Sequence, residues 1–405
     1  MLLAALLTGT SPAAAAPLRH VVRVELQGGE GVSSDVLLDL LPRRAPADYT
    51  DEELAEYQRR LNNLGIFDHV SVDLANGVLA VRVRKKFTLT PSIDFSTGRT
   101  LADTYLMLGA DQYNTFGRAA DLGGYGSYSE RAPNVELWYF EHAYDPHRMS
   151  PFIGANYFTS SLRFDQSDTG WMRRRAGGYG GFNLPFGYGS SLRFQIGVSV
   201  YHESYFDIEG PAAPSDGVYI GQWLEAAWDK FTFRDLAASG YRITLTAYPG
   251  ALIGPAQARH KMRLRYLQGI ALSDTTVIMF QGVGDVFTSG NPNWSALVGS
   301  VAGVRGLEDA YYRNTVQGVA NVELRQAWRF AERWALQGVL FADGATFRSM
   351  DERGHPGGWT YALSTGVGAR LIPTFLTSLV LRVDSAWLHE PESTWLLQTG
   401  LNQYF

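Results

Sequence analysis

The chain has 405 residues, including 43 Gly, 21 Tyr, 21 Phe, 10 Trp and no Cys, with a formal net charge of −5. Downstream of the N-terminus no apolar run approaches the roughly 18 residues that a membrane-spanning helix needs, which excludes a helical membrane protein. The pI of about 5.9 offers no basic footprint for nucleic acid, and the absence of Cys is compatible with export without disulfides.

Residues 1–16 have the composition of an export signal. An apolar stretch at 2–7 is followed by four Ala residues at 13–16, which suit cleavage by signal peptidase. The basic residues that usually precede such a stretch are missing, so a flexible apolar N-terminus is the alternative interpretation. We expect a signal peptide over residues 1–16.

Residues 19–86 differ in pattern from the rest of the chain. The predicted order of elements in this segment is strand, helix, helix, strand, strand. A capping box formed by Thr50 and Glu53 predicts the start of the second helix, and Gly65 predicts its end. Two alternating apolar runs that meet at a tight turn after Asn76 predict a closing hairpin. The segment is therefore expected to fold as a small α+β domain.

Within this segment, residues 61–72 read Leu-Asn-Asn-Leu-Gly-Ile-Phe-Asp-His-Val-Ser-Val. This stretch, with Gly65 and Phe67 at its centre, resembles the signature of a POTRA domain, the periplasmic module of the BamA/TamA superfamily. The resemblance covers the whole of 19–86. The usual acidic ending of the module is replaced by four basic residues, which we expect at the headgroup surface of the membrane: Arg82, Arg84, Lys85 and Lys86.

Residues 87–405 contain many segments in which apolar and polar side chains alternate, as in strands with one face in lipid and one in a polar lumen. At about ten residues a strand, there is room for about sixteen strands, an even number as bacterial barrels require. A soluble β-sandwich also alternates, but aromatic residues near many strand ends favour a membrane barrel. The predicted strands are 88–95, 104–113, 119–129, 134–143, 150–159, 176–184, 191–202, 218–230, 240–248, 260–273, 275–285, 315–328, 334–344, 359–371, 376–388 and 394–405.

The later strands predict which side chains face lipid. In the twelfth strand, Val322 and Leu324 are expected to point outward, and Asn321, Glu323 and Arg325 into the lumen. Charge belongs inside, because an Arg on the lipid face costs about 2 to 4 kcal/mol at the bilayer midplane. The fifteenth strand repeats the pattern, with Leu379, Leu381, Val383 and Trp387 outward and Arg382 and Asp384 inward.

A long connection at about 286–314, between the eleventh and twelfth strands, contains Val304, Arg305, Gly306 and Leu307 in succession. This tetrapeptide resembles the one that the BamA/TamA superfamily carries in the same loop, which folds back into the lumen. The ordinal position of the loop agrees with the family, and so does the POTRA segment upstream of it.

The resemblance implies a partner for Arg305 on the thirteenth strand, where Phe341 and Asp343 lie on the lumen parity. A guanidinium in a confined lumen suits a planar, bidentate carboxylate, so Arg305 and Asp343 are the predicted pair. The sequence departs from the family in that the usual Gly follows the Asp directly, as Gly344, which admits a β-bulge there. The alternative is a solvated Arg305 and an ordinary lumen carboxylate at Asp343.

The first and last predicted strands form the seam of the barrel. Pro91 in the first strand lacks an amide donor, and Gly400 in the last strand has no side chain to pack, so this pair should hold the fewest stable hydrogen bonds. The chain ends at Phe405, which resembles the C-terminal signal by which outer-membrane proteins are recognised for assembly. A simpler interpretation is an aromatic residue at the membrane interface.

The sequence contains no convincing enzyme or metal motif. Ser199 lies mid-strand without the second Gly of a nucleophile elbow, so a hydrolase module is not predicted. His142 and His147 flank a turn but have no further ligand cluster. The Gly-rich stretches at 123–126 and 177–181 fit barrel packing better than phosphate loops. No catalytic residue, cofactor or metal is expected.

The resemblance implies a non-enzymatic protein that inserts, assembles or translocates polypeptides at the bacterial outer membrane. The POTRA domain would bind an unfolded outer-membrane or secreted polypeptide by adding a strand to a sheet edge, and the seam would template or release it. Outer-membrane lipid is a further expected partner, and a periplasmic accessory protein is compatible with the resemblance. Nucleic acid is not expected as a partner.

Two other functions stay open. A two-partner-type secretion pore would pass one dedicated partner through the lumen, although such transporters usually carry two POTRA domains and an N-terminal plug helix. A passive porin or structural barrel belongs to a different class, against which the POTRA segment and the tetrapeptide around Arg305 argue. Single-channel conductance separates a passive pore from a barrel plugged by its own loop.

Overall fold

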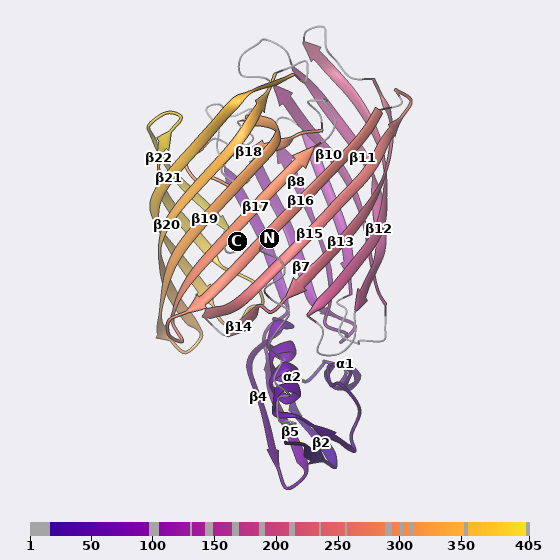
Figure 1. Ribbon diagram of the computed structural model, residues 1–405, viewed down its shortest axis with the longest axis vertical. Helices are drawn as coiled ribbons and strands as arrows, with labels where there is room; N and C mark the ends of the chain where they lie inside the picture. Colours follow the sequence, from indigo (N-terminus) through magenta and orange to yellow (C-terminus); the bar gives the residue numbers. More distant parts are fainter. Residues whose placement is uncertain are drawn as a thin grey trace, which may run out of the picture.

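The computed structural model shows an N-terminal α+β domain followed by a closed antiparallel barrel (Figure 1). No helix in the described part of the chain is long and apolar enough to cross a membrane. The predicted signal peptide at 1–16 lies outside the described residues. These are 17–96, 105–129, 132–141, 149–163, 170–185, 191–209, 215–234, 236–255, 257–287, 294–299, 303–307, 312–351 and 355–401.

The N-terminal domain contains the predicted strand, helix, helix, strand, strand order, with two further short strands. Its main sheet has the order β2-β5-β4, in which β2 runs parallel and β4 antiparallel to β5. The elements are β1 (Arg19–Val21), β2 (Arg23–Gly28), α1 (Ser34–Asp39), β3 (Ala47–Tyr49), α2 (Asp51–Asn63), β4 (Phe67–Ala75) and β5 (Val78–Lys85).

Local sequence explains the boundaries of α2. The Glu53 amide donates to Thr50 Oγ1 at 3.1 Å, and the Thr50 amide donates to Glu53 Oε2 at 2.9 Å, which completes a capping box. Gly65 follows the helix with a φ of +72°, a conformation that Gly adopts without strain. Tyr57 and Leu61 of α2 are fully buried in the domain core.

The barrel has the sixteen spanning strands that the sequence predicts. They are β6 (Leu89–Ser96), β7 (Tyr105–Thr115), β8 (Ala120–Ser129), β9 (Ala132–Phe140), β10 (Ser150–Arg163), β11 (Gly170–Pro185), β12 (Leu192–Glu209), β13 (Gly217–Asp229), β15 (Ala237–Ile253), β16 (Gln257–Ala271), β17 (Thr276–Phe287), β19 (Tyr312–Ala331), β20 (Trp334–Met350), β21 (Pro356–Pro373), β22 (Leu381–Glu390) and β23 (Thr394–Leu401). Two short strands, β14 (Thr232–Arg234) and β18 (Ala296–Val298), pair beside them.

The two faces of the barrel follow the predicted alternation. Val322 and Leu324 of β19 are 42% and 40% exposed, whereas Asn321 and Glu323 are completely buried. Charged and amide side chains thus lie inside, where they find partners, and aliphatic side chains cover the outer face. A barrel that is surrounded by lipid requires this arrangement of its two faces.

Two details of the barrel differ from the sequence predictions. Strand β22 begins at Leu381 rather than at residue 376, because Leu376 lies in the connection after β21 and forms a bridge with Phe87. The bulge admitted at Gly344 is also wrong, since the register between β19 and β20 runs without a shift through Asp343 and Gly344. The Gly therefore needs no unusual backbone there.

Strand β23 lies next to β6 in the order of the barrel and closes the ring. An antiparallel register runs through every other neighbouring pair of spanning strands, but between β23 and β6 no register falls within the described residues. The base of β6 has other support: the Phe87 amide donates to Phe375 O at 2.8 Å, and Thr90 Oγ1 donates to Thr377 O at 2.7 Å.

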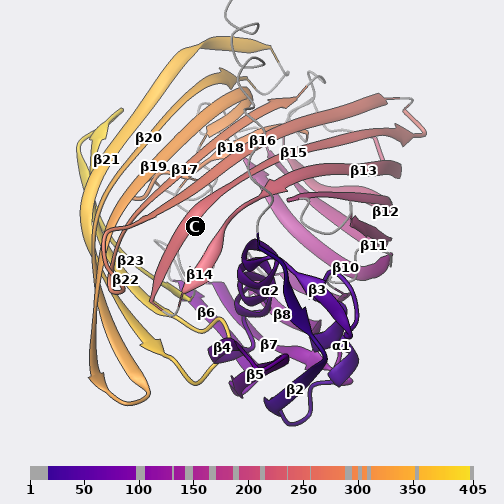
Figure 2. The same ribbon diagram turned by 60° about the horizontal axis from the view of Figure 1, so that its bottom comes forward.

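The N-terminal domain packs against one end of the barrel, which we term the proximal end (Figure 2). The Ser33 amide donates to Gly117 O at 2.8 Å in the turn between β7 and β8. On α2, Arg59 Nη1 and Asn63 Nδ2 donate to Phe231 O at 2.9 and 2.7 Å, between β13 and β14. The domain is therefore attached to two separate turns of the barrel.

Candidate functional site

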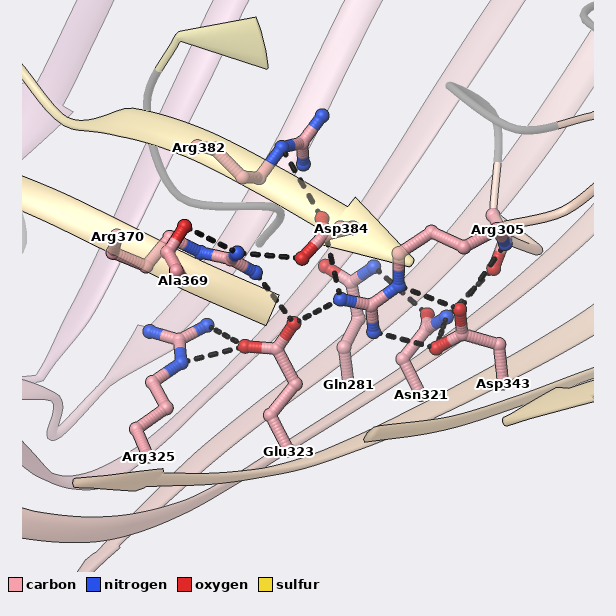
Figure 3. A network of polar contacts seen from close by, with 11 residues as sticks. Gln281, Arg305, Asn321, Glu323, Arg325, Asp343, Ala369, Arg370, Arg382 and Asp384 are labelled. Carbon is pink, nitrogen blue, oxygen red and sulfur yellow. Dashed lines mark hydrogen bonds and ion pairs between the residues drawn. The ribbon is translucent and has the colours of Figure 1, made fainter. Parts of the chain in front are cut away.

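The tetrapeptide of the long connection lies inside the barrel, against the wall formed by β19, β20 and β22. Val304 and Leu307 are buried there in an apolar cluster with Val319 and Phe347. Gly306 has a φ of +93°, a conformation that side chains rarely adopt, and this bend lets the segment turn within the lumen. The apolar residues thus anchor the segment, and Arg305 between them faces the polar part of the wall (Figure 3).

Arg305 binds Asp343 in a bidentate geometry. Its Nε donates to Oδ2 at 2.7 Å and its Nη2 donates to Oδ1 at 2.8 Å, while the Arg305 amide also donates to Oδ2 at 3.1 Å. The guanidinium carbon lies 3.5 Å from the centre of the Phe341 ring, so the cation stacks on the ring face. The structure therefore brings together the three residues that the sequence links.

Two more carboxylates face the same guanidinium. Arg305 Nη1 donates to Glu323 Oε1 at 2.5 Å and lies 3.8 Å from Asp384 Oδ2. The sequence places both acids in the lumen but does not connect them with Arg305. Their shared signal is a charged residue on the inward parity of its strand, β19 for Glu323 and β22 for Asp384.

The network extends to three further arginines. Arg325 Nη2 lies 2.6 Å from Glu323 Oε2, Arg370 Nη1 lies 2.5 Å from Asp384 Oδ1, and Arg382 Nε lies 3.4 Å from Asp384 Oδ2. Arg370, near the proximal end of β21, is the member that sequence reasoning missed. Four guanidinium groups and three carboxylates form the lumen network: Arg305, Arg325, Arg370, Arg382, Glu323, Asp343 and Asp384.

Asn321 connects the network to the main chain of the inserted segment. Its Nδ2 donates to Asp343 Oδ1 at 2.9 Å and to Gly303 O at 2.6 Å. Arg305, Glu323, Asp343 and Asp384 are all at most 1% exposed. Removing one member of such a buried set leaves charge without a partner, which typically costs about 3 to 5 kcal/mol.

The start of the same connection lies against a different part of the wall. Trp294 Nε1 donates to His260 O at 3.2 Å, and the Trp294 ring lies 5.4 Å from the Tyr219 ring and 6.0 Å from the Phe287 ring. Tyr219 belongs to β13 and His260 to β16, whereas Arg305 is held by strands β19 to β22. The connection is thus fixed at two places across the lumen.

The other predicted site residues lie apart from this network. Gly65 and Phe67 belong to the N-terminal domain, where Phe67 is buried in the core. Pro91 pairs with Ala110 of β7 on the exposed outer face, and Gly400 pairs with Arg382 of β22. Phe405, like His142 and His147, lies outside the described residues.

The contact between α2 and the barrel contains an acid with a shifted pKa. Arg59 Nε and Nη2 donate to the two carboxylate oxygens of Glu56 at 2.6 and 2.7 Å, and Arg60 Nε donates to the same group at 2.8 Å. Burial raises the pKa of Glu56, but the two guanidinium groups outweigh it and hold the pKa below its usual range. Glu56 therefore keeps Arg59 in place toward Phe231.

No protein-family model matches the chain, and no curated protein matches it in sequence. Solved structures of similar fold include three that match nearly the whole length of the chain. BamA from Haemophilus ducreyi lacking POTRA domains 1–3 has a TM-score of 0.54 at 13% identity, covering 94% of this chain and 84% of that one. CdiB from Escherichia coli has 0.66 at 12%, with 94% and 76% covered.

CdiB from Acinetobacter baumannii has a TM-score of 0.60 at 14% identity, covering 95% of this chain and 74% of that one. The chain has the BamA and CdiB fold. Its barrel has sixteen spanning strands and is preceded by a small α+β region. With an apolar outer face and a buried polar network in the lumen, this BamA/CdiB-type chain is built as a transmembrane barrel.

Proposed function

We propose that the chain is an outer-membrane protein that inserts, assembles or translocates polypeptides, without enzymatic chemistry, and that its N-terminal domain lies in the periplasm. One observation carries the proposal. The barrel holds its own inserted segment by the Arg305 network on β19 to β22, the last of which pairs with the seam strand β23. A passive pore has no need of such a segment, whereas a barrel that opens only for a client does.

The same proposal covers the domain boundaries. Residues 1–16 are assigned to a signal peptide, 19–86 to a POTRA domain, and 87–405 to the barrel, with an inward-folding loop at about 286–314. The order β2-β5-β4 leaves β4 at one edge of the domain sheet. An unfolded polypeptide can add a strand to such an edge through main-chain hydrogen bonds.

The seam is the proposed exit. Paired strands of a closed barrel expose no main-chain groups to a client, so a client strand needs a weak pair at which to enter. Pro91 of β6 has no amide hydrogen, and Gly400 of β23 has no side chain to pack. The apolar outer face would then receive the client together with outer-membrane lipid.

The fold comparison favours a second candidate. BamA is an outer-membrane assembly factor and CdiB a two-partner secretion transporter, and both CdiB structures score higher than BamA, at 0.66 and 0.60 against 0.54. In a secretion pore the dedicated partner would pass through the lumen after the inserted segment leaves. The seam would then stay closed during transport.

A disulfide across the seam tests these candidates. The chain has no Cys, so Ser92→Cys with Gln398→Cys, or register neighbours of Gln398, can form only the intended bond. Both side chains are on the inward parity of their strands. Activity that is lost on oxidation and restored by reduction supports lateral opening. Full activity with a confirmed crosslink overturns it and makes transport through the lumen the better account.

The client can be identified in the same experiments. Crosslinking in intact envelopes, followed by purification of the barrel, is expected to recover polypeptides bound to the N-terminal domain. Single-channel recording in planar bilayers is expected to show little conductance until the inserted segment is released. A large constant conductance in the unmodified protein would instead identify a passive porin.

A further inference from the structure

We propose that Arg382 is a positioning residue that couples the inserted segment to the seam. It holds the last strand, β23, on one side and shares a carboxylate with Arg305 on the other. This inference deepens the proposed function, because it assigns the contact through which the position of the segment controls closure of the barrel. Three observations support it.

The first observation is the contact between Arg382 and Gly400. The two residues face each other in the register of β22 and β23. A Cβ atom at Gly400 would lie 2.8 Å from Arg382 Nη2 and 3.3 Å from Arg382 Nε. The guanidinium therefore occupies the space that a side chain at position 400 would need. Packing against Arg382, rather than an unusual φ, accounts for the glycine in the last strand.

The second observation is the carboxylate that Arg382 shares. Asp384 is completely buried, and its Oδ2 atom lies 3.4 Å from Arg382 Nε and 3.8 Å from Arg305 Nη1. Its other oxygen, Oδ1, accepts from Arg370 Nη1 at 2.5 Å. Arg305 and Arg382 thus face the same oxygen atom from two sides, as Figure 3 shows.

The third observation places this contact at the seam itself. A groove of about 490 Å³ on the barrel wall is lined by Ile93 of β6 and by Thr399, Gly400 and Leu401 of β23, and Arg382 lines it too. Most of the remaining lining is aliphatic, from β20, β21 and β22. The hollow opens on the outer face, where Ile93, Leu381 and Val383 are exposed, so Arg382 and the two seam strands border one groove of the wall.

Charge balance gives the coupling its direction. With Arg305 in place, four guanidinium groups share three carboxylates, and Arg382 Nε lies 3.4 Å from Asp384 Oδ2. When Arg305 leaves, Asp384 Oδ2 loses one of its two cations, and the attraction on Arg382 increases. Arg382 then moves toward Asp384 and away from its place over Gly400, which removes a packing contact from β23. Because coupling is reciprocal, separation of β23 also changes how firmly Asp384 holds Arg305.

The test measures closure of the seam without any client. The rate of disulfide formation between Cys residues at positions 92 and 398 is followed in barrels folded in lipid vesicles. Arg305→Ala is expected to change this rate at least about fivefold, the lower end of typical coupling between two sites. In a background with Arg382→Gln, the same Arg305→Ala substitution is expected to change it less than about twofold.

A matched control separates this contact from a general loss of charge. Arg325→Gln removes another guanidinium from the same network, but Arg325 lies on β19 and binds Glu323. In that background Arg305→Ala should keep its full effect on the crosslinking rate. Gly400→Ala should behave like Arg382→Gln, because the added methyl group displaces the guanidinium. Slower migration of boiled than of unboiled samples, or the reverse, confirms in each case that the barrel is folded.

Three outcomes would overturn the proposal. These are an unchanged crosslinking rate in Arg305→Ala, an equal effect of Arg305→Ala with and without Arg382, and loss of the effect in the Arg325→Gln control. None of them bears on whether polypeptides leave through the seam. Conversely, full activity of the disulfide-locked barrel would overturn lateral opening. It would not affect the proposed coupling between the inserted segment and the seam.

Discussion

Two of the regions in which arginine and carboxylate side chains meet, the lumen network and the contact between α2 and the barrel, differ in their exposure to water. In the lumen, Arg305 and Asp343 are at most 1% exposed. Where α2 contacts the barrel, the side chains of Arg59 and Glu56 remain 18% and 22% exposed. Arg59 donates a hydrogen bond there to the main-chain oxygen of Phe231. Water can replace the second set of contacts but not the first. The inserted segment should therefore be held or released as a unit, whereas the domain can adjust its attachment in small steps.

The largest effect is expected for Arg305→Ala. The substitution leaves Asp343 buried without its guanidinium partner and removes one of the cations around Glu323, a loss of about 3 to 5 kcal/mol that destabilises the inserted segment. The barrel should stay folded, because interstrand hydrogen bonds hold it. A Cys at Leu307 reports the change through its rate of maleimide labelling, which should rise at least tenfold. Arg348→Ala, an exposed residue on the same strand as Asp343, should leave the rate unchanged.

Equal labelling of the Cys in the parent and Arg305→Ala proteins would show that the apolar contacts of the segment suffice to hold it. If Arg305→Ala did not form a folded barrel, interstrand hydrogen bonds alone would not suffice to hold the barrel wall. The shift of boiled samples on a denaturing gel distinguishes the two results.

A smaller effect on the same segment is expected for Gly306→Ala. The φ of +93° strains any side chain, at a cost of about 1 to 3 kcal/mol, and the new methyl group would lie 3.4 Å from Ala386 and Leu388. Labelling at position 307 should increase, but less than in Arg305→Ala. Gly344→Ala provides the control, because its Cβ would meet no atom closer than 3.9 Å. If both glycine variants labelled alike, backbone strain at Gly306 would not be the cause.

At the domain contact, Asn63→Ala should have a modest and local effect. Asn63 Nδ2 donates to Phe231 O, and the Phe233 amide donates to Asn63 Oδ1 at 3.2 Å, so the substitution removes two hydrogen bonds worth about 0.5 to 1.5 kcal/mol each. Hydrogen exchange at the Phe233 amide should accelerate about fivefold or more. Asn62→Ala, the neighbouring residue on α2, should not change it. Equal exchange in both variants would mean that other contacts hold this turn.

The smallest effect is expected from pH. The folded pKa of Glu56 lies below its ordinary value, so its contribution to stability is complete above the unfolded pKa of about 4.5 and is lost as pH falls through the folded pKa. Acidification through the folded pKa of Glu56 should therefore loosen the attachment of α2, seen as faster exchange at the Phe233 amide. Glu56→Gln should remove this part of the pH dependence, and Glu52→Gln, an exposed residue on the same helix, should keep it. An unchanged pH profile in Glu56→Gln would contradict the assignment.

Much of the barrel could be predicted because lipid imposes a simple rule on each strand. The outward residues Val322 and Leu324 are apolar and the inward Glu323 is charged, so the face of each residue can be read from its neighbours. Beyond the lipid band this rule stops, and β12, predicted to end near residue 202, continues to Glu209. The start of β22 was placed too early for a related reason, since Leu379 continues the alternation although its segment leaves the sheet.

The candidate site was predictable only in part. A four-residue motif identified Arg305, and the resemblance supplied Asp343, but alternation says only that a side chain faces inward. Arg370 of β21 reaches Asp384 of β22 only because of the stagger between these two strands, and a shift of one residue would exchange the two faces. The unpredicted member of the network, Arg370, is therefore one whose contact depends on the register between strands.

The hydrogen bonds of Phe87 and Thr90 to the connection after β21 give strand β6 a fixed point about which it can pivot. These contacts tie the foot of the first strand to residues 375–377, and the Lys86 amide, one residue earlier, donates to Ile66 O of the N-terminal domain at 2.8 Å. A gap between β6 and β23 would therefore widen as a wedge, narrow at the proximal end and broad at the opposite rim. A rotation of the domain would act on the narrow end of that wedge, where a small swing gives the widest opening far away.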